Sequence, residues 1–101
     1  MQDFVNIGTL IATFGVKGEM VLLHHLGTKP DLAGIEAFFI EEATDRFIPY
    51  FISSKKVRTN EEILVSFEGI DTVEKARAYL KKKIWIPEAD AKKMASKSAP
   101  I

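Results

Sequence analysis

Six short segments with the pattern of β-strands restrict the fold of this 101-residue chain more than any other feature of its sequence. Apolar and polar side chains alternate in most of them, which is typical of a strand with one buried face. The segments cover residues 4–12, 20–26, 37–42, 47–54, 63–67 and 83–87. We therefore predict an all-β fold, a small six-stranded antiparallel β-barrel with one short helix before the last strand, because closure of the sheet leaves no free strand edges.

The alternation also predicts which side chains form the core. In the first strand we expect Val5, Ile7 and Ile11 on one side and Leu10 on the other. The second strand is almost entirely apolar, as expected for a strand that is covered on both faces. The complete predicted core consists of Val5, Ile7, Val21, Leu23, Ile63, Val65, Phe67, Ala76, Leu80 and Ile84.

Local signals predict a turn, an irregular strand and a helix. Residues 43–46 are typical of a hairpin connection. Pro49 has no N–H to donate, so it indicates an edge or a bulge in the fourth strand. Asp71 precedes an amphipathic segment and Glu74 follows it three residues later, so we predict a helix with Asp71 as its N-cap.

Composition excludes several classes of site and protein. The chain has no cysteine, which excludes disulfides, thiolate nucleophiles and cysteine-based zinc sites. Its apolar runs are far shorter than the roughly 20 residues that span a bilayer. The first three residues, Met-Gln-Asp, carry no positive charge, unlike the start of a signal peptide. We expect a monomeric, cytoplasmic protein without a membrane segment.

The two histidines do not form a convincing catalytic or metal site. His24 and His25 are adjacent in a predicted strand, where successive side chains point to opposite faces. No Gly-x-Ser-x-Gly nucleophile motif and no phosphate-binding glycine loop is present. We therefore expect no catalytic residue, no metal and no cofactor.

A glycine-containing loop at residues 13–19 is the clearest candidate for a functional site. Gly15 and Gly18 allow the chain to fold back sharply between the first two strands, which exposes Lys17 at the tip. Loop residues on a rigid scaffold often carry function. The alternative is a turn that needs glycine for its geometry alone, and the KH-domain Gly-x-x-Gly loop does not apply because it joins two helices. The partner contacts that we expect are Gly15, Val16, Lys17, Gly18 and Glu19.

Positive charge is concentrated in the second half of the chain. Residues 1–50 contain three Lys or Arg and seven Asp or Glu, whereas residues 51–101 contain eleven and seven. Cations of this kind neutralise phosphates, although a solvated surface is the alternative. The candidate RNA contacts are Lys55, Lys56 and Arg58, between the fourth and fifth predicted strands, and Lys81, Lys82 and Lys83, before the sixth. The aromatic residues that would either stack on bases or fill the core are Phe38, Phe39, Tyr50, Phe51 and Trp85.

Two separated motifs in the same order resemble the N-terminal domain of the ribosome maturation factor RimM family. The first is the strand and glycine turn of residues 7–19, IGTLIATFGVKGE. The second comprises residues 63–76, ILVSFEGIDTVEKA, followed by residues 83–87, KIWIP. The resemblance covers roughly residues 4–90. One departure is Phe14, because this position is often histidine in the family, so no role of that histidine transfers to this chain.

The resemblance implies a barrel of the translation-factor type and a non-enzymatic assembly factor. Such a factor associates with the small ribosomal subunit, through a ribosomal protein of the head and nearby rRNA, and supports 16S rRNA processing. It also implies that residues 1–90 are the N-terminal barrel and residues 91–101 a linker or tail toward an absent PRC-type barrel. The alternatives are a free-standing barrel that binds RNA through its basic C-terminal half, and a barrel domain from an unrelated enzyme.

Overall fold

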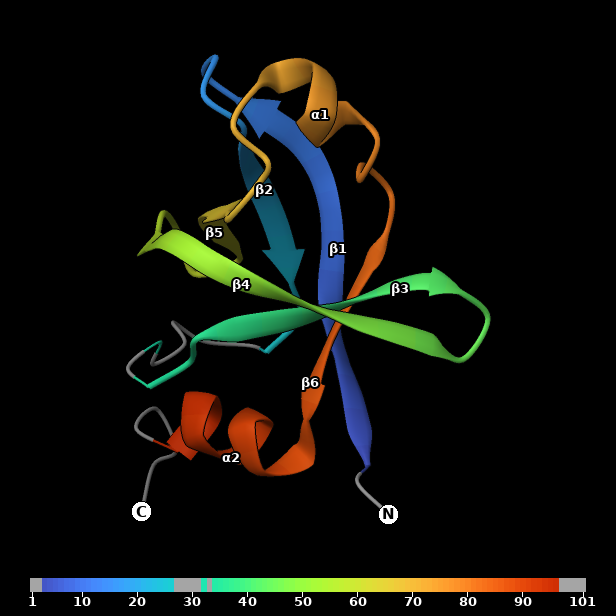
Figure 1. The fold of residues 1–101 in the computed structure, drawn as a ribbon. Coiled ribbons are helices and arrows are strands. Elements are labelled where there is room, and N and C mark those ends of the chain that lie inside the picture. The colour runs from blue at the N-terminus through green and yellow to red at the C-terminus, as the bar shows by residue number, and fades with distance from the viewer. Residues whose placement is uncertain (1–2, 27–31, 33, 97–101) are drawn as a thin grey trace.

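The computed structural model describes residues 3–26, 32 and 34–96 of the chain. Its six antiparallel strands are β1 (Phe4–Phe14), β2 (Glu19–His24), β3 (Ala37–Ala43), β4 (Arg46–Val57), β5 (Glu62–Phe67) and β6 (Lys83–Pro87). The order of the strands around the sheet is β1-β2-β5-β4-β3-β6, and β6 pairs with β1, so the sheet closes into a barrel (Figure 1). The predicted six-stranded antiparallel fold is confirmed.

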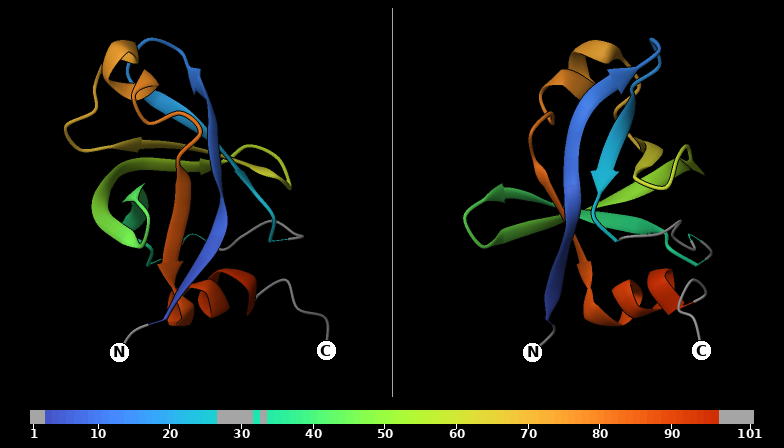
Figure 2. Two further views of the ribbon diagram at one scale, coloured as in Figure 1. Left: turned by 90° about the vertical axis from the view of Figure 1, so that its right-hand side faces the viewer. Right: turned by 180° about the vertical axis from the view of Figure 1, so that it is seen from behind.

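Two short helices lie at opposite ends of the barrel (Figures 1 and 2). α1 (Val73–Arg77) lies beside the turn between β1 and β2. α2 (Glu88–Ser96) follows β6 directly and lies near the start of β1. Of the segment predicted as a linker or tail, residues 91–96 belong to α2 and residues 97–101 lie outside the described part of the chain.

Apolar side chains from five strands and from α1 fill the barrel interior, and the partly buried Tyr50 and Ile52 of β4 pack against them. Removing this surface from water is the main stabilising contribution to such a fold. The predicted core residues Ile7, Ile63, Val65, Phe67, Ala76 and Ile84 belong to this cluster, together with Leu10, Met20, Leu22, Ile35, Phe38, Ile40, Ile70 and Ile86, which the prediction missed.

In β2 the prediction assigned the wrong side chains to the interior. Met20 and Leu22 are fully buried in the core, whereas Leu23 is 41% exposed. Val21 is buried but does not belong to the core cluster. The reason is that a nearly continuous apolar run has no alternation from which its inward face can be read, so only the pairing with neighbouring strands decides it.

A change of register in β1 reverses another expectation. The pairing of β1 with β6 shifts between Asn6 and Gly8, as at a β-bulge. Leu10 is fully buried and Ile11 is 44% exposed, although Ile11 was expected on the same side as Ile7. An extra residue in one strand moves the following side chains to the other face, and simple alternation cannot anticipate it.

The cap of α1 is also one residue away from its predicted place. Thr72 is the N-cap, with extended backbone angles, and its Oγ1 accepts a hydrogen bond of 3.2 Å from Lys75 N. Asp71 instead accepts a hydrogen bond of 3.1 Å from Lys75 Nζ. The helix ends at Arg77, and Leu80 packs against the core from the turn that follows.

The hairpin predicted at residues 43–46 is confirmed. Ala43 pairs with Arg46, so Thr44 and Asp45 form the turn, and Asp45 has a φ of 61°. Pro49 lies in the part of β4 that pairs with β3 and precedes the first residue of β4 that pairs with β5. Pro49 therefore lies where β4 is an edge strand, as predicted for a residue that has no N–H to donate.

Candidate functional site

The glycine loop connects the paired ends of β1 and β2. Phe14 pairs with Glu19, and the four residues between them form the turn. Gly15 and Gly18 have φ values of 72° and 89°, a left-handed conformation that favours glycine. Lys17 is exposed, as predicted. The loop is therefore a sharp turn that presents side chains at one end of the barrel.

Gly18 is required for a second reason. A Cβ atom at this position would lie 2.4 Å from the backbone oxygen of Ile70 and 3.1 Å from Cα of Asp71. The base of the loop therefore packs directly on the backbone that connects β5 to α1. Gly15 has no atom within 4 Å of such a Cβ, so only its backbone angle favours glycine there.

The outer surface of the β1–β2 hairpin carries most of the exposed apolar side chains. Among the described residues, five large apolar side chains are exposed, and Phe51 of β4 is the one that lies elsewhere. The other four are Ile11 at 44%, Phe14 at 40%, Val16 at 77% and Leu23 at 41% exposed. We call these four residues and Lys17 the hairpin face. Clusters of this kind are typical of protein–protein contacts.

Arg58, which follows β4, reaches Phe14 of the hairpin face. Its guanidinium carbon lies 5.0 Å from the centroid of the Phe14 ring, within the range of a cation–π interaction. Because β2 and β5 lie between β1 and β4, the Arg58 side chain crosses their outer surfaces. Val21 of β2 pairs with Leu64 of β5. Neither belongs to the core cluster, yet Val21 is only 4% exposed and Leu64 only 9%.

The candidate RNA-binding cations have three different environments. Lys55 and Lys56 lie within β4, not after it, since this strand extends to Val57. Lys55 is only partly exposed, and its Nζ donates a hydrogen bond to the Ile35 carbonyl, so it is not a free surface cation. Lys56 and Arg58 are exposed.

The remaining candidate cations lie along the side of β1 that faces β6, opposite β2, and are Lys81, Lys82 and Lys83. Lys81 N donates to Leu10 O at 2.6 Å, and Leu10 N donates to Lys82 O at 3.0 Å. Lys83 pairs with Thr9. The two groups of cations, which are far apart in the sequence, therefore border the hairpin on opposite sides.

The aromatic candidates are divided between core and surface. Phe38 is fully buried and Phe51 is 56% exposed. Phe39 and Trp85 are half-buried in an outer aromatic cluster with Phe4 and Phe47. Burial raises the pKa of Tyr50, and hydrogen bonds of its hydroxyl with Glu42 (2.6 Å) and Tyr79 (3.2 Å) add to this effect.

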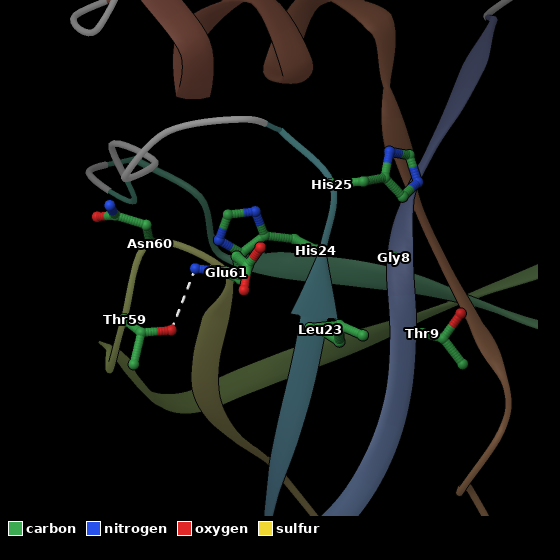
Figure 3. A pocket seen from close by; sticks show the side chains of 8 residues that line it. All are labelled: Gly8, Thr9, Leu23, His24, His25, Thr59, Asn60 and Glu61. Atoms are coloured by element: carbon green, nitrogen blue, oxygen red, sulfur yellow. Dashed lines mark hydrogen bonds between the residues drawn. The ribbon is translucent and has the colours of Figure 1, made fainter.

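A hollow of about 910 Å³ lies at the end of the hairpin away from the glycine loop (Figure 3). Its walls come from β1, from the end of β2 and from the turn between β4 and β5. The lining residues are Gly8, Thr9, Leu23, His24, His25, Thr59, Asn60 and Glu61. Figure 3 shows His24 and His25 pointing to opposite sides of the chain, as predicted for adjacent residues of a strand.

His24 is the buried polar side chain of this region, at 4% exposed. Its Nδ1 accepts a hydrogen bond of 3.3 Å from Leu26 N, and its buried Nε2 has no hydrogen-bond partner. Burial lowers the pKa of His24, the nearby His25 lowers it further, and Glu61 opposes both effects. His25 differs, since it is exposed and its Nε2 is 3.1 Å from Asn6 Oδ1.

Sequence reasoning placed the glycine loop correctly and missed the rest of this surface. Leu23 was assigned to the core and Ile11 to the same side of the strand as Ile7, and the contact of Arg58 with Phe14 has no local sequence signal. Within the described ranges, no group of three or more His, Asp or Glu side chains could hold a metal ion. No described helix is long and apolar enough to cross a membrane.

Comparison with known proteins identifies relatives of this chain. Residues 5–91 match the sequence model of the RimM N-terminal domain. A ribosome maturation factor RimM from Phocaeicola vulgatus is 31% identical over 88 residues, which are 86% of this chain and 49% of that protein. The one from Bacteroides fragilis is 27% identical over 88 residues, 85% of this chain and 47% of that protein. The chain thus spans about half the length of these relatives.

Two solved structures share the fold. A crystal structure of a RimM 16S ribosomal RNA processing protein from Pseudomonas aeruginosa superposes with a TM-score of 0.70 at 20% identity. The match covers 87% of this chain and 52% of that one. The solution structure of the N-terminal domain of RimM from Thermus thermophilus gives a TM-score of 0.66, also at 20% identity, and covers 86% of this chain and 92% of that domain.

Proposed function

The chain belongs to the RimM family, and from this membership we propose that it takes part in maturation of the small ribosomal subunit. In this proposal it is a binding module and not an enzyme, as the name of its relatives, ribosome maturation factor, indicates. It acts as a cytoplasmic monomer that associates with the subunit and supports 16S rRNA processing.

The hairpin face is the observation that carries this proposal. Four of the five exposed large apolar side chains of the described residues gather on one hairpin, at the end of which the glycine loop exposes Lys17. An exposed apolar cluster with a polar border is typical of a surface that becomes buried against a partner protein. We propose that a ribosomal protein of the subunit head binds here, and that the exposed cations beside the hairpin contact nearby rRNA.

Co-sedimentation with small ribosomal subunits tests this proposal. Phe14→Ser combined with Val16→Ser should lower the bound fraction at least about fivefold, because truncated contacts at the centre of an interface cost more than 1 kcal/mol. Phe51→Ser is the matched control, since it removes an aromatic ring that is even more exposed than Phe14 from β4, away from the hairpin. If the double variant sediments like the unaltered chain, the hairpin face is not the contact surface.

The alternative of a barrel that binds RNA alone is distinguished by salt. If phosphates dominate, the affinity should fall steeply with salt, by about one unit of log–log slope for each contact. Replacing Lys81, Lys82 and Lys83 by Gln should then flatten that slope. An association that is insensitive to both changes favours the ribosomal protein as the partner.

A further inference from the structure

Lys81 has a backbone conformation that lysine rarely adopts. Its φ is 73°, in the left-handed region, where the Cβ atom of an L-residue crowds a backbone carbonyl oxygen. Among the described residues, Asp45 is the other non-glycine residue with a positive φ. Asp45 lies in the turn between β3 and β4, and aspartate tolerates this conformation because its short side chain can form local hydrogen bonds. The lysine side chain has no such compensation.

The main chain between α1 and β6 fixes this conformation and does not need a lysine for it. Figure 1 shows this connection beside β1. Lys81 N donates to Leu10 O at 2.6 Å, and Lys82 O accepts from Leu10 N at 3.0 Å, so the connection is joined to β1. Lys82 N also donates to Tyr79 O at 3.2 Å. Glycine could make the same backbone hydrogen bonds without the steric conflict, so the lysine at this position has another reason.

The segment around Lys81 concentrates positive charge. Residues 77–83, RAYLKKK, contain four cations and no acidic residue. Arg77, Lys81 and Lys83 are exposed and Lys82 is half-buried. None of these four side chains has an ion-pair or hydrogen-bond partner among the described residues. This side of the hairpin therefore offers cations that are free to bind an anionic partner.

The cations on the other side of the hairpin are mostly engaged. Lys55 Nζ donates to a backbone carbonyl, and Arg58 lies over the Phe14 ring and 3.8 Å from Glu62. Of that group, Lys56 is the exposed cation without a partner among the described residues. A cation that already has a partner must give up that contact before it binds a phosphate. The α1–β6 side is therefore the better site for RNA.

We propose that Lys81 binds a phosphate of rRNA, and that this contact explains why a lysine occupies a position that favours glycine. Lysine binds phosphate as a point charge. Lys83 is exposed two residues further on, close enough to contact a second phosphate of the same RNA chain. The RNA would pass beside Ile11 of the hairpin face, because its neighbour Leu10 is hydrogen-bonded to Lys81. The inference rests on the proposed function, since it assigns the rRNA contact to one side of the hairpin.

Loss of the Lys81 charge tests the contact. A fluorescein-labelled single-stranded RNA of mixed sequence is titrated with the chain at several salt concentrations and followed by anisotropy. Lys81→Asn should lower the affinity about fivefold at low salt and reduce the log–log salt slope by about one unit, as expected for one phosphate contact. Lys92→Gln, which removes the charge of an exposed lysine of α2, is the control and should change neither.

The same replacement should make the fold more stable. Asparagine and glycine both tolerate the left-handed region, so Lys81→Asn and Lys81→Gly should each raise the midpoint of thermal unfolding by a few degrees. Asp45→Gly should raise it less, because aspartate already tolerates this conformation, and it should not lower the RNA affinity. A gain in stability together with a loss of RNA affinity is the expected result at Lys81 alone.

Four results would overturn the proposal. Lys81→Asn could bind RNA as tightly as the unaltered chain. The midpoint could fail to rise in both variants, which would show that the conformation is not a reason for the lysine. Lys56→Gln could lower the affinity as much as Lys81→Asn, which would place the RNA on the other side of the hairpin. Poly-glutamate could displace the RNA at equal charge, which would indicate an acidic protein segment as the partner.

The outcomes separate this inference from the proposed function. If the unaltered chain co-sediments with subunits but Lys81→Asn binds RNA normally, the proposed function is retained and the Lys81 contact is lost. If Lys81→Asn weakens RNA binding but the unaltered chain does not co-sediment, the contact is retained and the role in subunit maturation is lost.

Discussion

The guanidinium of Arg58 lies 5.0 Å from the centre of the Phe14 ring, so a residue that follows β4 covers the last residue of β1. Arg58 is also fixed at its other side, with Nε 3.8 Å from Glu62 Oε1. This contact joins the glycine loop to the β4–β5 turn. The end of β1 is thereby connected to the beginning of β5.

Replacing Arg58 should weaken the fold modestly. Arg58→Met keeps most of the side-chain length and removes the charge, so we expect a loss of about 0.5–1 kcal/mol in the free energy of unfolding, as for an exposed cation–π pair. Urea denaturation measures it. Arg77→Met, at an exposed position of α1, is the control and should change the midpoint little.

The two glycines of the loop should respond differently to alanine. Gly15→Ala places a Cβ in open space, so its cost should be about 1–2 kcal/mol, from the positive φ alone. Gly18→Ala should cost clearly more, because the Cβ also overlaps the Ile70 carbonyl. Thermal unfolding of the two variants gives the comparison, and equal losses would contradict the packing of Gly18 on the β5–α1 connection.

Neighbouring leucines of β2 provide a direct test of the strand's orientation. Leu22→Ala should cost about 2–5 kcal/mol, because Leu22 is fully buried in the core. Leu23→Ala should cost less than about 1 kcal/mol, because that side chain is 41% exposed. Val65→Ala and Phe67→Ala should resemble Leu22→Ala. A larger loss for Leu23 than for Leu22 would show that β2 faces the other way.

Stability should decrease at acid pH because of His24. Burial lowers its pKa in the folded state, so below the ordinary value of about 6.5 the unfolded chain binds a proton that the folded chain does not. The contribution is complete above that pH and is lost as the pH falls below it. His24→Gln should flatten this part of the stability profile. His25→Gln should retain most of it, because burial is the largest cause of the shift.

Lys17 should matter for association and not for folding. Its side chain is exposed at the loop tip, so Lys17→Ala should leave the free energy of unfolding within about 0.5 kcal/mol. We expect the same variant to reduce co-sedimentation with small ribosomal subunits. Lys92→Ala, an exposed lysine of α2, is the control. If both variants co-sediment like the unaltered chain, the loop serves only as a turn.

The sequence by itself determined the elements that depend on local interactions. Alternation gave β5 its inward residues Ile63, Val65 and Phe67, because one face of a strand repeats every second residue. Gly15 and Gly18 predicted the sharp turn, since their positive φ values are closed to most other residues. The bounds of β6 were predicted as observed, from residue 83 to residue 87.

Only the tertiary structure decided which faces the ambiguous segments present. β2 has no alternation, so its pairing with β1 and β5 selected Leu22 for the core and left Leu23 outside. The register shift between Asn6 and Gly8, in the pairing of β1 with β6, turned Leu10 inward and Ile11 outward. The pairing of β5 with β2 and β4 then brought Arg58 to Phe14 and Glu61 to His24, contacts between residues far apart in the chain, for which a local pattern carries no information.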